Sequence, residues 1–417
     1  MRNNQTTARV FHSCLLPLAL LLSGALHQES LAAAGAKAAS PARLELGIDV
    51  LEDENFAPLL GKRVGLITNQ TGIDSRGRRT VDVLFSAEGV KLVALFGPEH
   101  GIAGRLDERV PLTADAITSL PVYSLYGETR RPTDQMLRGL DALVFDMQAA
   151  GVRFHTYITT MAYALEAAAR HHISFYVLDR PNPFGGELIE GPMLDRDRLS
   201  FEGYFPMPVL YGMTLGELAQ MFNAENKIGA DLHVIPMKNW RRREAFDSTG
   251  LSWIPPSPNL QTLAGLWPYP GVEILRAAGV SVGRGTATPF QIFGAPWIDG
   301  VKLARELNRR KVPGARFPPI KFTPSDDVSK GQECAGASIT ITNRVAFRPM
   351  RMGLEIIATL HKLYPDHFEV ARAIRLLGSS STIERLQRGD PSGQIIAGWF
   401  ADLASFRKMR EKYLLYR

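Results

Sequence analysis

The chain has 417 residues, more than one ordinary hydrophobic core needs, so its length predicts two domains. Its hydrophobic content of 45% is ordinary for a globular protein, and its formal net charge is +6. Residues 1–40 hold three basic side chains and one acidic side chain, so they contribute +2, and residues 41–417 carry only +4. So mild an excess, with no dense basic run outside 241–243, argues against a nucleic-acid-binding protein.

The first 38 residues have the pattern of a secretory signal peptide. Arg2 and Arg9 precede an apolar run that starts at residue 14 and is too short to span a membrane, and small residues follow at 32–36. We expect residues 1–38 to be removed, leaving a periplasmic or secreted protein with no stable membrane insertion. An uncleaved membrane anchor is the alternative. Cleavage would leave Cys334 as the one cysteine, which excludes an internal disulfide.

Short apolar runs alternate with helical patterns through the first part of the chain. Strands are expected at 64–67, 92–96, 121–125, 142–145, 174–178 and 231–237, and helices near 81–85, 159–170 and 214–225. This alternation predicts βαβ units and a parallel sheet, hence an α/β domain.

The pattern changes after a proline- and tryptophan-rich loop at 253–260. The glycine-rich and polar-aromatic segment 270–296 follows as a boundary, and we expect it to contribute to the site. From residue 297, helical stretches at 301–310, 353–363 and 397–416 frame short strands such as 337–341. We therefore expect the α/β domain to span 42–266, and a second, smaller α+β domain at 267–417 to complete a cleft.

Four of the predicted strands end in polar clusters. These clusters are Asn69-Gln70, Glu99-His100, Asp146 with Gln148, and Asp179-Arg180 with Asn182. In an open parallel sheet, the ligand crevice lies beyond the carboxyl ends of the strands. Any one cluster could equally form a turn or cap a helix, as Asp146 alone could. Four clusters on one edge predict a functional cleft.

Several common chemistries lack their motifs. No glycine-rich dinucleotide or phosphate loop is present, and no Gly-x-Ser-x-Gly elbow supplies a serine nucleophile. His100, His155 and His233 lack the spacing of zinc ligands, so we expect neither a metal nor a cofactor. Carboxylates, amides, arginines and aromatic rings remain, and together they favour a carbohydrate site.

Six motifs carry a resemblance to a known family. They are GKRVGLITNQTG at 61–72, FGPEHG at 96–101, FDMQ at 145–148, DRPNP at 179–183, GRGT at 283–286 and GAPW at 294–297. From about residue 46 to the carboxyl terminus, the chain resembles the exo-β-N-acetylmuramidase (NamZ) family. One departure is the sequence RAAGV at 276–280, where relatives are expected to carry a polar Glu-Gly-Thr-Asn-like stretch.

The resemblance implies a Rossmann-like catalytic domain, a smaller partner domain and a cleft between them. It also implies a glycosidase that releases N-acetylmuramic acid from the non-reducing end of peptidoglycan fragments during cell-wall turnover and recycling. The expected partner is thus a peptidoglycan-derived oligosaccharide. Two alternatives remain, a non-catalytic periplasmic binding protein for muropeptides or sugars and a nucleotide- or phosphate-using enzyme, and the missing phosphate loop counts against the second.

Chemistry suggests roles for the individual residues. Glu99 is the expected general acid, because burial between domains would keep a carboxyl group protonated near neutral pH. Asp146 is the second catalytic carboxylate, acting as base, as nucleophile, or by orienting the substrate's 2-acetamido group. Either acid could instead have a structural role. His100 either holds Glu99, binds a hydroxyl group, or is a buried structural histidine.

The remaining candidates bind substrate. The lactyl carboxylate of muramic acid needs a cation, and arginine binds carboxylates in bidentate fashion. Amides suit hydroxyl and acetamide groups, and tyrosine rings stack on sugars. The predicted substrate-binding residues are the cations Arg153, Arg180 and Arg284, the polar Asn69, His100, Gln148, Asp179 and Asn182, and Tyr157, with Tyr269 as a further ring. Most arginines and tyrosines are structural, so that role remains open for each.

Overall fold

The computed structural model describes residues 43–104 and 113–417, and the stretch Arg43–Arg417 forms one compact unit. The expected signal peptide therefore lies outside the described residues. Within the described part of the chain, no helix is both long enough and apolar enough to cross a membrane.

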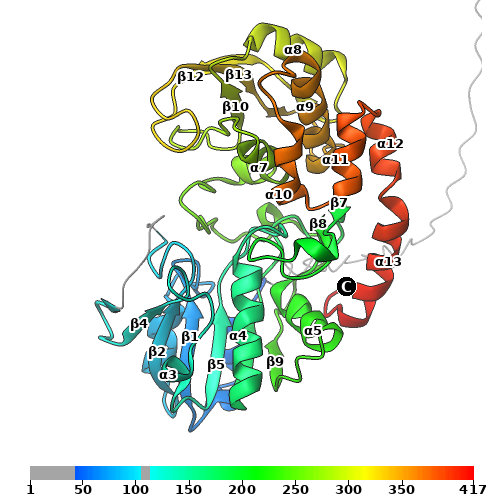
Figure 1. Cartoon of the computed structure of the whole chain (residues 1–417). Helices are drawn as coiled ribbons and strands as arrows, with labels where there is room; N and C mark the ends of the chain where they lie inside the picture. Colours follow the sequence, from blue (N-terminus) through cyan, green and yellow to red (C-terminus); the bar gives the residue numbers. More distant parts are fainter. Residues whose placement is uncertain (1–42, 105–112) are drawn as a thin grey trace, which may run out of the picture. The chain divides into compact units, whose positions relative to one another are not determined.

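A seven-stranded sheet forms the centre of the first domain, in the order β3-β4-β2-β1-β5-β6-β9 (Figure 1). Its strands are β1 (Arg63–Thr68), β2 (Lys91–Gly97), β3 (Thr113–Ala114), β4 (Pro121–Ser124), β5 (Ala142–Asp146), β6 (Ser174–Leu178) and β9 (Leu232–Ile235). All neighbouring pairs are parallel except β3 with β4. The predicted parallel α/β sheet is confirmed, and its carboxyl ends share one edge.

Helices cover both faces of this sheet, because side chains of a strand alternate between its faces. Leu143 and Phe145 of β5 join a core with α4 (Tyr157–His171) and α5 (Leu215–Glu225). Ala142 and Val144 join a second core with α1 (Gly47–Asp53) and α2 (Thr80–Ser86). A short helix, α3 (Asp134–Leu137), precedes β5. Burial of both strand faces explains why the sequence shows continuous apolar runs.

The smaller second domain is built on an antiparallel sheet in the order β10-β13-β12. Its strands are β10 (Ile292–Ala295), β12 (Pro319–Phe322) and β13 (Cys334–Ser338), with a separate pair of β11 (Ala315–Arg316) and β14 (Thr340–Ile341). Its helices are α7 (Tyr269–Ala277), α8 (Gly300–Arg309), α9 (Pro349–Leu363), α10 (Ile374–Leu377), α11 (Ser380–Gln387), α12 (Ser392–Ala397) and α13 (Phe400–Arg410). The strand expected at 337–341 is divided between β13 and β14, and the helix expected at 397–416 begins at Phe400.

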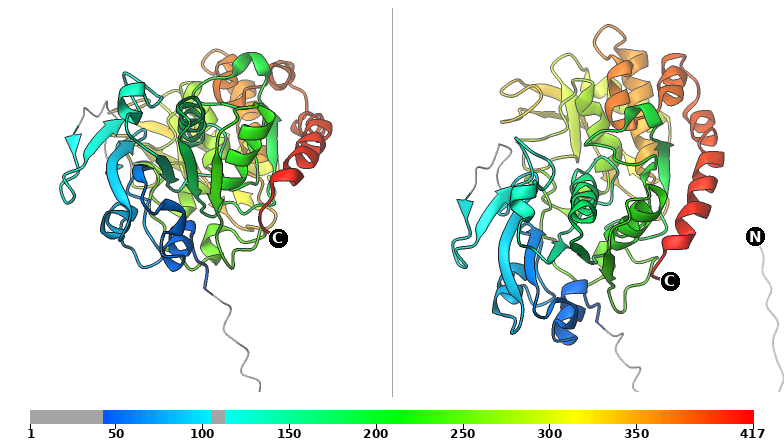
Figure 2. Two further views of the ribbon diagram at one scale, coloured as in Figure 1. Left: turned by 90° about the horizontal axis from the view of Figure 1, so that it is seen from below. Right: turned by 60° about the horizontal axis from the view of Figure 1, so that its bottom comes forward.

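Two features join the chain's early and late segments. One apolar core runs without a break from the first sheet to α9 and α13, and α6 (Leu263–Leu266) and α7 both contribute to it, so the boundary at 266 stays a prediction. Helix α13 contacts the hairpin strand β7 (Glu190–Met193), which pairs with β8 (Pro208–Leu210) (Figure 2). Tyr416, close to the last residue of the sequence, donates a hydrogen bond to Asp179, next to the end of β6.

Candidate active site

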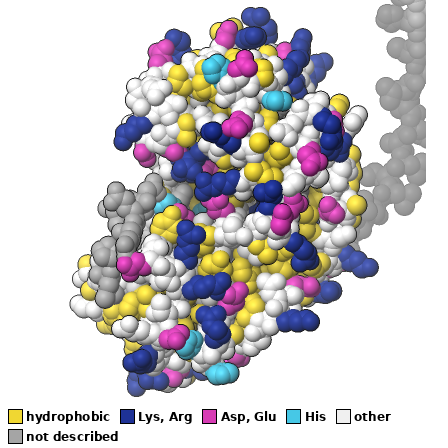
Figure 3. All heavy atoms as spheres, viewed as in Figure 1, with side chains coloured by type: hydrophobic (Ala, Val, Ile, Leu, Met, Phe, Trp, Pro, Cys, Tyr) yellow, Lys and Arg dark blue, Asp and Glu magenta, His cyan; other side chains and the backbone are white. Residues whose placement is uncertain are grey.

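A cavity of about 430 Å³ lies between the carboxyl end of β2, the start of α4 and helix α7. On the face shown in Figure 3, the molecule is hollowed where the second domain meets the first, and basic and acidic side chains gather there. We call this cavity the acidic pocket. It is lined by Glu99, His100, Tyr126, Phe154, His155, Thr156, Tyr157, Glu202, Ser257, Asn259, Tyr269, Glu273, Arg276, Ala277, Arg284, Asp326, Asp327, Arg375 and Leu376.

Glu99 reaches this pocket because the chain turns sharply after β2. His100 and Gly101 both have a φ of 70°, in the left-handed region, which ends the strand and turns the chain at the sheet edge. The Glu99 side chain is half-buried, and Thr156 Oγ1 donates a hydrogen bond to its Oε2 over 2.5 Å. The pocket thus contains a carboxyl group whose orientation is fixed by a neighbour.

His155 and Tyr157 form the wall beside Glu99. The Nδ1 atom of His155 is buried without a hydrogen-bond partner among the described residues, and burial, with His100 nearby, lowers the pKa of His155 to about 3. Tyr157 packs edge-on against this ring and donates its hydroxyl hydrogen bond to Pro256 O over 2.5 Å. A neutral histidine and an aromatic ring can contact a sugar without adding charge.

Opposite Glu99, arginines and carboxylates are paired with one another. Arg284 Nη2 donates to Glu273 Oε1 over 2.6 Å, and Arg284 Nε lies 3.5 Å from Asp327 Oδ2. Arg276 also pairs with Asp327. Arg284 was predicted from the sequence, whereas Glu273, Arg276 and His155 were not. Glu273 and Arg276 lie in α7, within the segment 270–296 that was expected to contribute to the site, but nothing in the sequence singled out these two side chains.

Asp146 does not line the acidic pocket. It is fully buried at the end of β5 and accepts two hydrogen bonds from Arg180, over 2.5 Å from Nε and 2.9 Å from Nη2. Thr80 Oγ1 donates a third over 2.5 Å. The structure therefore pairs Asp146 with Arg180 away from the acidic pocket. The catalytic role of Asp146 stays a prediction.

Arg153 is also away from the pocket surface. Its side chain is buried, and it donates four hydrogen bonds to the carbonyl oxygens of Pro192, Met207, Leu376 and Leu377 over 2.7–3.0 Å. Burial lowers the pKa of Arg153 to about 9. The arrangement ties the β7–β8 hairpin to α10.

The other polar candidates use their side chains in hydrogen bonds within the protein. Asp179 accepts hydrogen bonds from Thr214 Oγ1, Gly216 N and Tyr416 over 2.5–2.9 Å, and burial raises its pKa to about 6. Asn182 Nδ2 donates to Met213 O over 2.8 Å. Asn69 Oδ1 accepts from Thr71 N and Oγ1 over 2.9 and 2.6 Å. None of these three side chains lines the acidic pocket.

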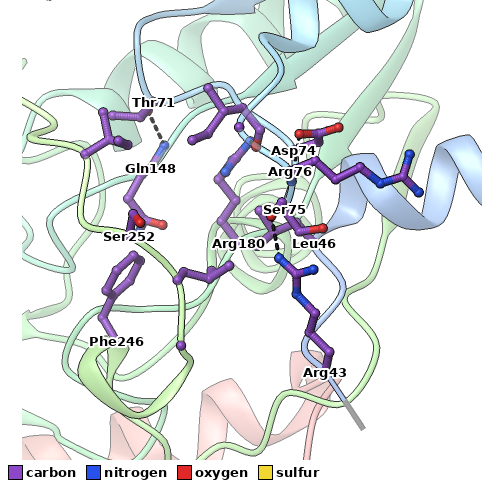
Figure 4. Close-up of a pocket in the computed structure, with 15 residues that line it drawn as sticks. Arg43, Leu46, Thr71, Asp74, Ser75, Arg76, Gln148, Arg180, Phe246 and Ser252 are labelled. Carbon is purple, nitrogen blue, oxygen red and sulfur yellow. Dashed lines mark hydrogen bonds between the residues drawn. The ribbon is translucent and has the colours of Figure 1, made fainter.

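A second cavity of about 240 Å³, which we call the amide pocket, lies along the same sheet edge (Figure 4). Its lining includes Thr71, Gln148, Arg180, Phe246 and Ser252.

The loop 253–260 separates the two cavities, since Ile254 lines the amide pocket and Ser257 lines the acidic pocket. Gln70 Nε2 holds this loop by donating to Pro255 O over 2.7 Å. All four polar clusters thus lie at one edge of the sheet. The residues of these clusters that line a cavity are divided between the acidic pocket and the amide pocket. In the part of the chain that the structure describes, no group of three His, Cys, Asp or Glu side chains is placed to hold a metal ion.

Two family models cover most of the chain. The model of the amino-terminal part of the exo-β-N-acetylmuramidase NamZ matches residues 64–264, and that of the carboxyl-terminal part matches residues 267–416. The chain is also 43% identical to the peptidoglycan β-N-acetylmuramidase NamZ of Bacillus subtilis (strain 168) over 379 residues, which is 90% of this chain and 92% of that protein.

Two crystal structures of DUF1343-family proteins from Bacteroides fragilis NCTC 9343 share the fold. The first is 41% identical with a TM-score of 0.84, and the second is 29% identical with a TM-score of 0.75. In each case the match covers 90% of this chain and 99% of the other. On these matches, the chain belongs to the exo-β-N-acetylmuramidase NamZ family.

Proposed function

We propose that this protein is an exo-acting glycoside hydrolase that releases N-acetylmuramic acid from the non-reducing end of peptidoglycan fragments. The observation that carries the proposal is the acidic pocket, where the half-buried, oriented carboxyl group of Glu99 shares one cavity with arginines. A glycosidase needs a carboxyl group to protonate the leaving oxygen, and an acidic sugar needs a cation. Family membership and the name of the Bacillus subtilis relative support the same activity.

The proposed acid step follows from the geometry of Glu99. Because Thr156 donates to Oε2, the proton is carried by Oε1, which gives it to the glycosidic oxygen as the bond to the sugar breaks. Arg284 binds the lactyl carboxylate. His155 and Tyr157 contact the neutral part of the sugar. Asp146 as the second carboxylate is kept as a prediction, to be tested by substitution.

Substitution of Glu99 by glutamine tests the proposal. The change is nearly isosteric, so folding and binding should persist, but an amide cannot protonate a leaving oxygen. Turnover of a natural disaccharide should fall by about 10²–10⁴-fold, and that of an aryl N-acetylmuramide by less, because its leaving group needs less protonation. Arg284→Ala should instead raise KM more than it lowers kcat.

The exposed Glu88, on the same domain, supplies the control Glu88→Gln, which should keep wild-type kinetics. Wild-type kcat in Glu99→Gln would remove Glu99 as the acid. A wild-type protein that binds N-acetylmuramic acid but cleaves no N-acetylmuramide would favour the binding-protein alternative. We further propose that the protein is exported to the periplasm or secreted and acts in cell-wall recycling, on the basis of the signal-like residues 1–38.

A further inference from the structure

Two arginines and two carboxylates of the acidic pocket form a group whose charges cancel, here called the charge cluster. Glu273 and Arg276 lie on α7, Arg284 follows in the turn after it, and Asp327 comes from the loop after β12. Glu273 Oε1 lies 2.6 Å from Arg284 Nη2 and 3.8 Å from Arg276 Nη1. Asp327 pairs with both arginines. A third arginine of the cavity, Arg375 on α10, pairs with Glu202 over 2.5 Å. Every arginine that lines the acidic pocket therefore already has a carboxylate partner, and none is left over for an anionic ligand.

Glu273 is the most enclosed member of the charge cluster. Its side chain is 6% exposed, against 21% for Arg284, and its Oε2 is buried without a hydrogen-bond partner among the described residues. A buried carboxylate is stable only when a cation and hydrogen bonds satisfy it. Burial raises the pKa of Glu273, with Asp327 adding to this effect, while Arg284 and Arg276 oppose it. Tyr269, one turn earlier on α7, is buried and supplies no charge.

The turn that follows Arg284 is held by hydrogen bonds to its backbone. Ser325 donates two hydrogen bonds to Gly285 O, over 3.1 Å from its backbone N and 2.7 Å from its Oγ. Gly285 has a φ of 72°, and a Cβ there would lie 2.3 Å from Asp326 N, so the turn requires glycine. The Arg284 Nε atom is buried and has no hydrogen-bond partner in the described part of the chain, with Asp327 Oδ2 at 3.5 Å. The backbone beside Arg284 is therefore held in one conformation, and this places the guanidinium at the pocket wall.

We propose that Glu273 takes up one proton from solvent when the pocket binds a sugar that carries a carboxylate. The sugar's carboxylate pairs with Arg284, and the charge cluster then holds three carboxylates against two arginines. Protonation of Glu273 restores neutrality, and no bond to the sugar is formed or broken in this step. A neutral sugar leaves the Glu273–Arg284 pair intact and takes up no proton. This inference rests on the proposed function, because it assigns the ligand as an acidic sugar.

Calorimetric titration in buffers of different ionisation enthalpy measures this proton directly. N-acetylmuramic acid and N-acetylglucosamine should be titrated into the wild-type protein from about pH 5.5 to 9, a range in which the acid's own carboxyl group stays ionised. We expect an uptake approaching about one proton for the acidic sugar at some pH in this range, and none for the neutral sugar. Above the pH at which Glu273 ionises in the free protein, the Kd for the acidic sugar should rise by up to about tenfold per pH unit.

Glu273→Gln should still bind the acidic sugar but lose both the proton uptake and this pH dependence. The matched control is Glu355→Gln, because Glu355 pairs with Arg310 over 2.8 Å outside the acidic pocket, and this variant should keep the uptake. No uptake by the wild type at any pH, no binding of the acidic sugar, or retained uptake in Glu273→Gln would each overturn the inference. If Glu273→Gln fails to fold, the proton uptake of the wild-type protein with the acidic sugar, compared with the neutral sugar, still tests the inference. Cleavage of an N-acetylmuramide by wild type is measured separately, so a failed inference is distinguished from a failed function.

Discussion

Arg153→Met is expected to destabilise the fold rather than weaken substrate recognition. Methionine keeps much of the side chain's length and apolar contact, but it removes the donor from the carbonyl oxygens of Pro192, Met207, Leu376 and Leu377. Of these, Met207 O keeps a second donor, the backbone N of Leu194 at 3.2 Å. A hydrogen bond to a charged group contributes about 1.5–3 kcal/mol. Removal of the charge also recovers its desolvation cost, so a net loss of about 3–5 kcal/mol is expected.

Thermal and denaturant unfolding measure this loss. For a chain of this size the unfolding entropy is roughly 0.8 kcal/mol per kelvin, so Tm should fall by about 4–6 °C. The Tm of Arg153→Lys should lie between those of wild type and Arg153→Met, because lysine keeps the charge but lacks the planar fork of donors. The exposed Arg388 supplies the control Arg388→Met, which should cost at most about 0.5 kcal/mol. If Arg153→Met has the Tm of wild type while its KM for the acidic substrate rises, the structural explanation is wrong. Arg153 would then be a substrate-binding cation, as the sequence predicted.

Three further predictions concern Asp146, Asp179 and the amino terminus. Asp146→Asn leaves Arg180 buried without its counter-charge and should cost about 3–5 kcal/mol in denaturant unfolding; a variant of wild-type stability without activity would instead support a catalytic role. The pKa of Asp179 is raised to about 6, so the folded state binds the proton more tightly, and the stability this gives is complete below about pH 4 and lost as pH rises through 6. Asp179→Asn should lack that part of the pH dependence of Tm. Intact-mass analysis of the exported protein should show a start between about residues 33 and 40, and a mass that retains residues 1–32 would contradict cleavage.

The first domain was predictable because its strands are buried on both faces. In β5 the residues 142–145 are all apolar, and the polar Asp146 marks the carboxyl end of the strand. The second domain gave weaker signals, because its strands are short and mostly antiparallel. Ile339 separates β13 from β14 in an otherwise continuous β-type pattern, and nothing local in the sequence marks that break.

Site residues that directly follow a strand could be predicted from the sequence. Site residues that reach the pocket only through packing between the two domains could not. Glu99 follows β2 directly, so its place at the sheet edge could be inferred from local sequence. Glu273 lies on α7, and its position in the same cavity depends on how α7 packs against distant parts of the chain. Long-range packing of this kind leaves no periodic signal in one sequence. The prediction of polar clusters at one edge likewise could not show that the loop 253–260 divides that edge into two pockets.

The three arginines predicted to receive the lactyl carboxylate differ in the donors that they have left. Arg153 uses both terminal nitrogens on four carbonyl oxygens, and Arg180 uses Nε and Nη2 on Asp146. Arg284 makes one hydrogen bond, to Glu273, and is the only one of the three that lines the acidic pocket. A guanidinium can exchange a partner only if the new carboxylate reaches it and the old one can be neutralised. Among these three, Arg284 meets both conditions, because its partner Glu273 is the carboxylate whose burial favours protonation.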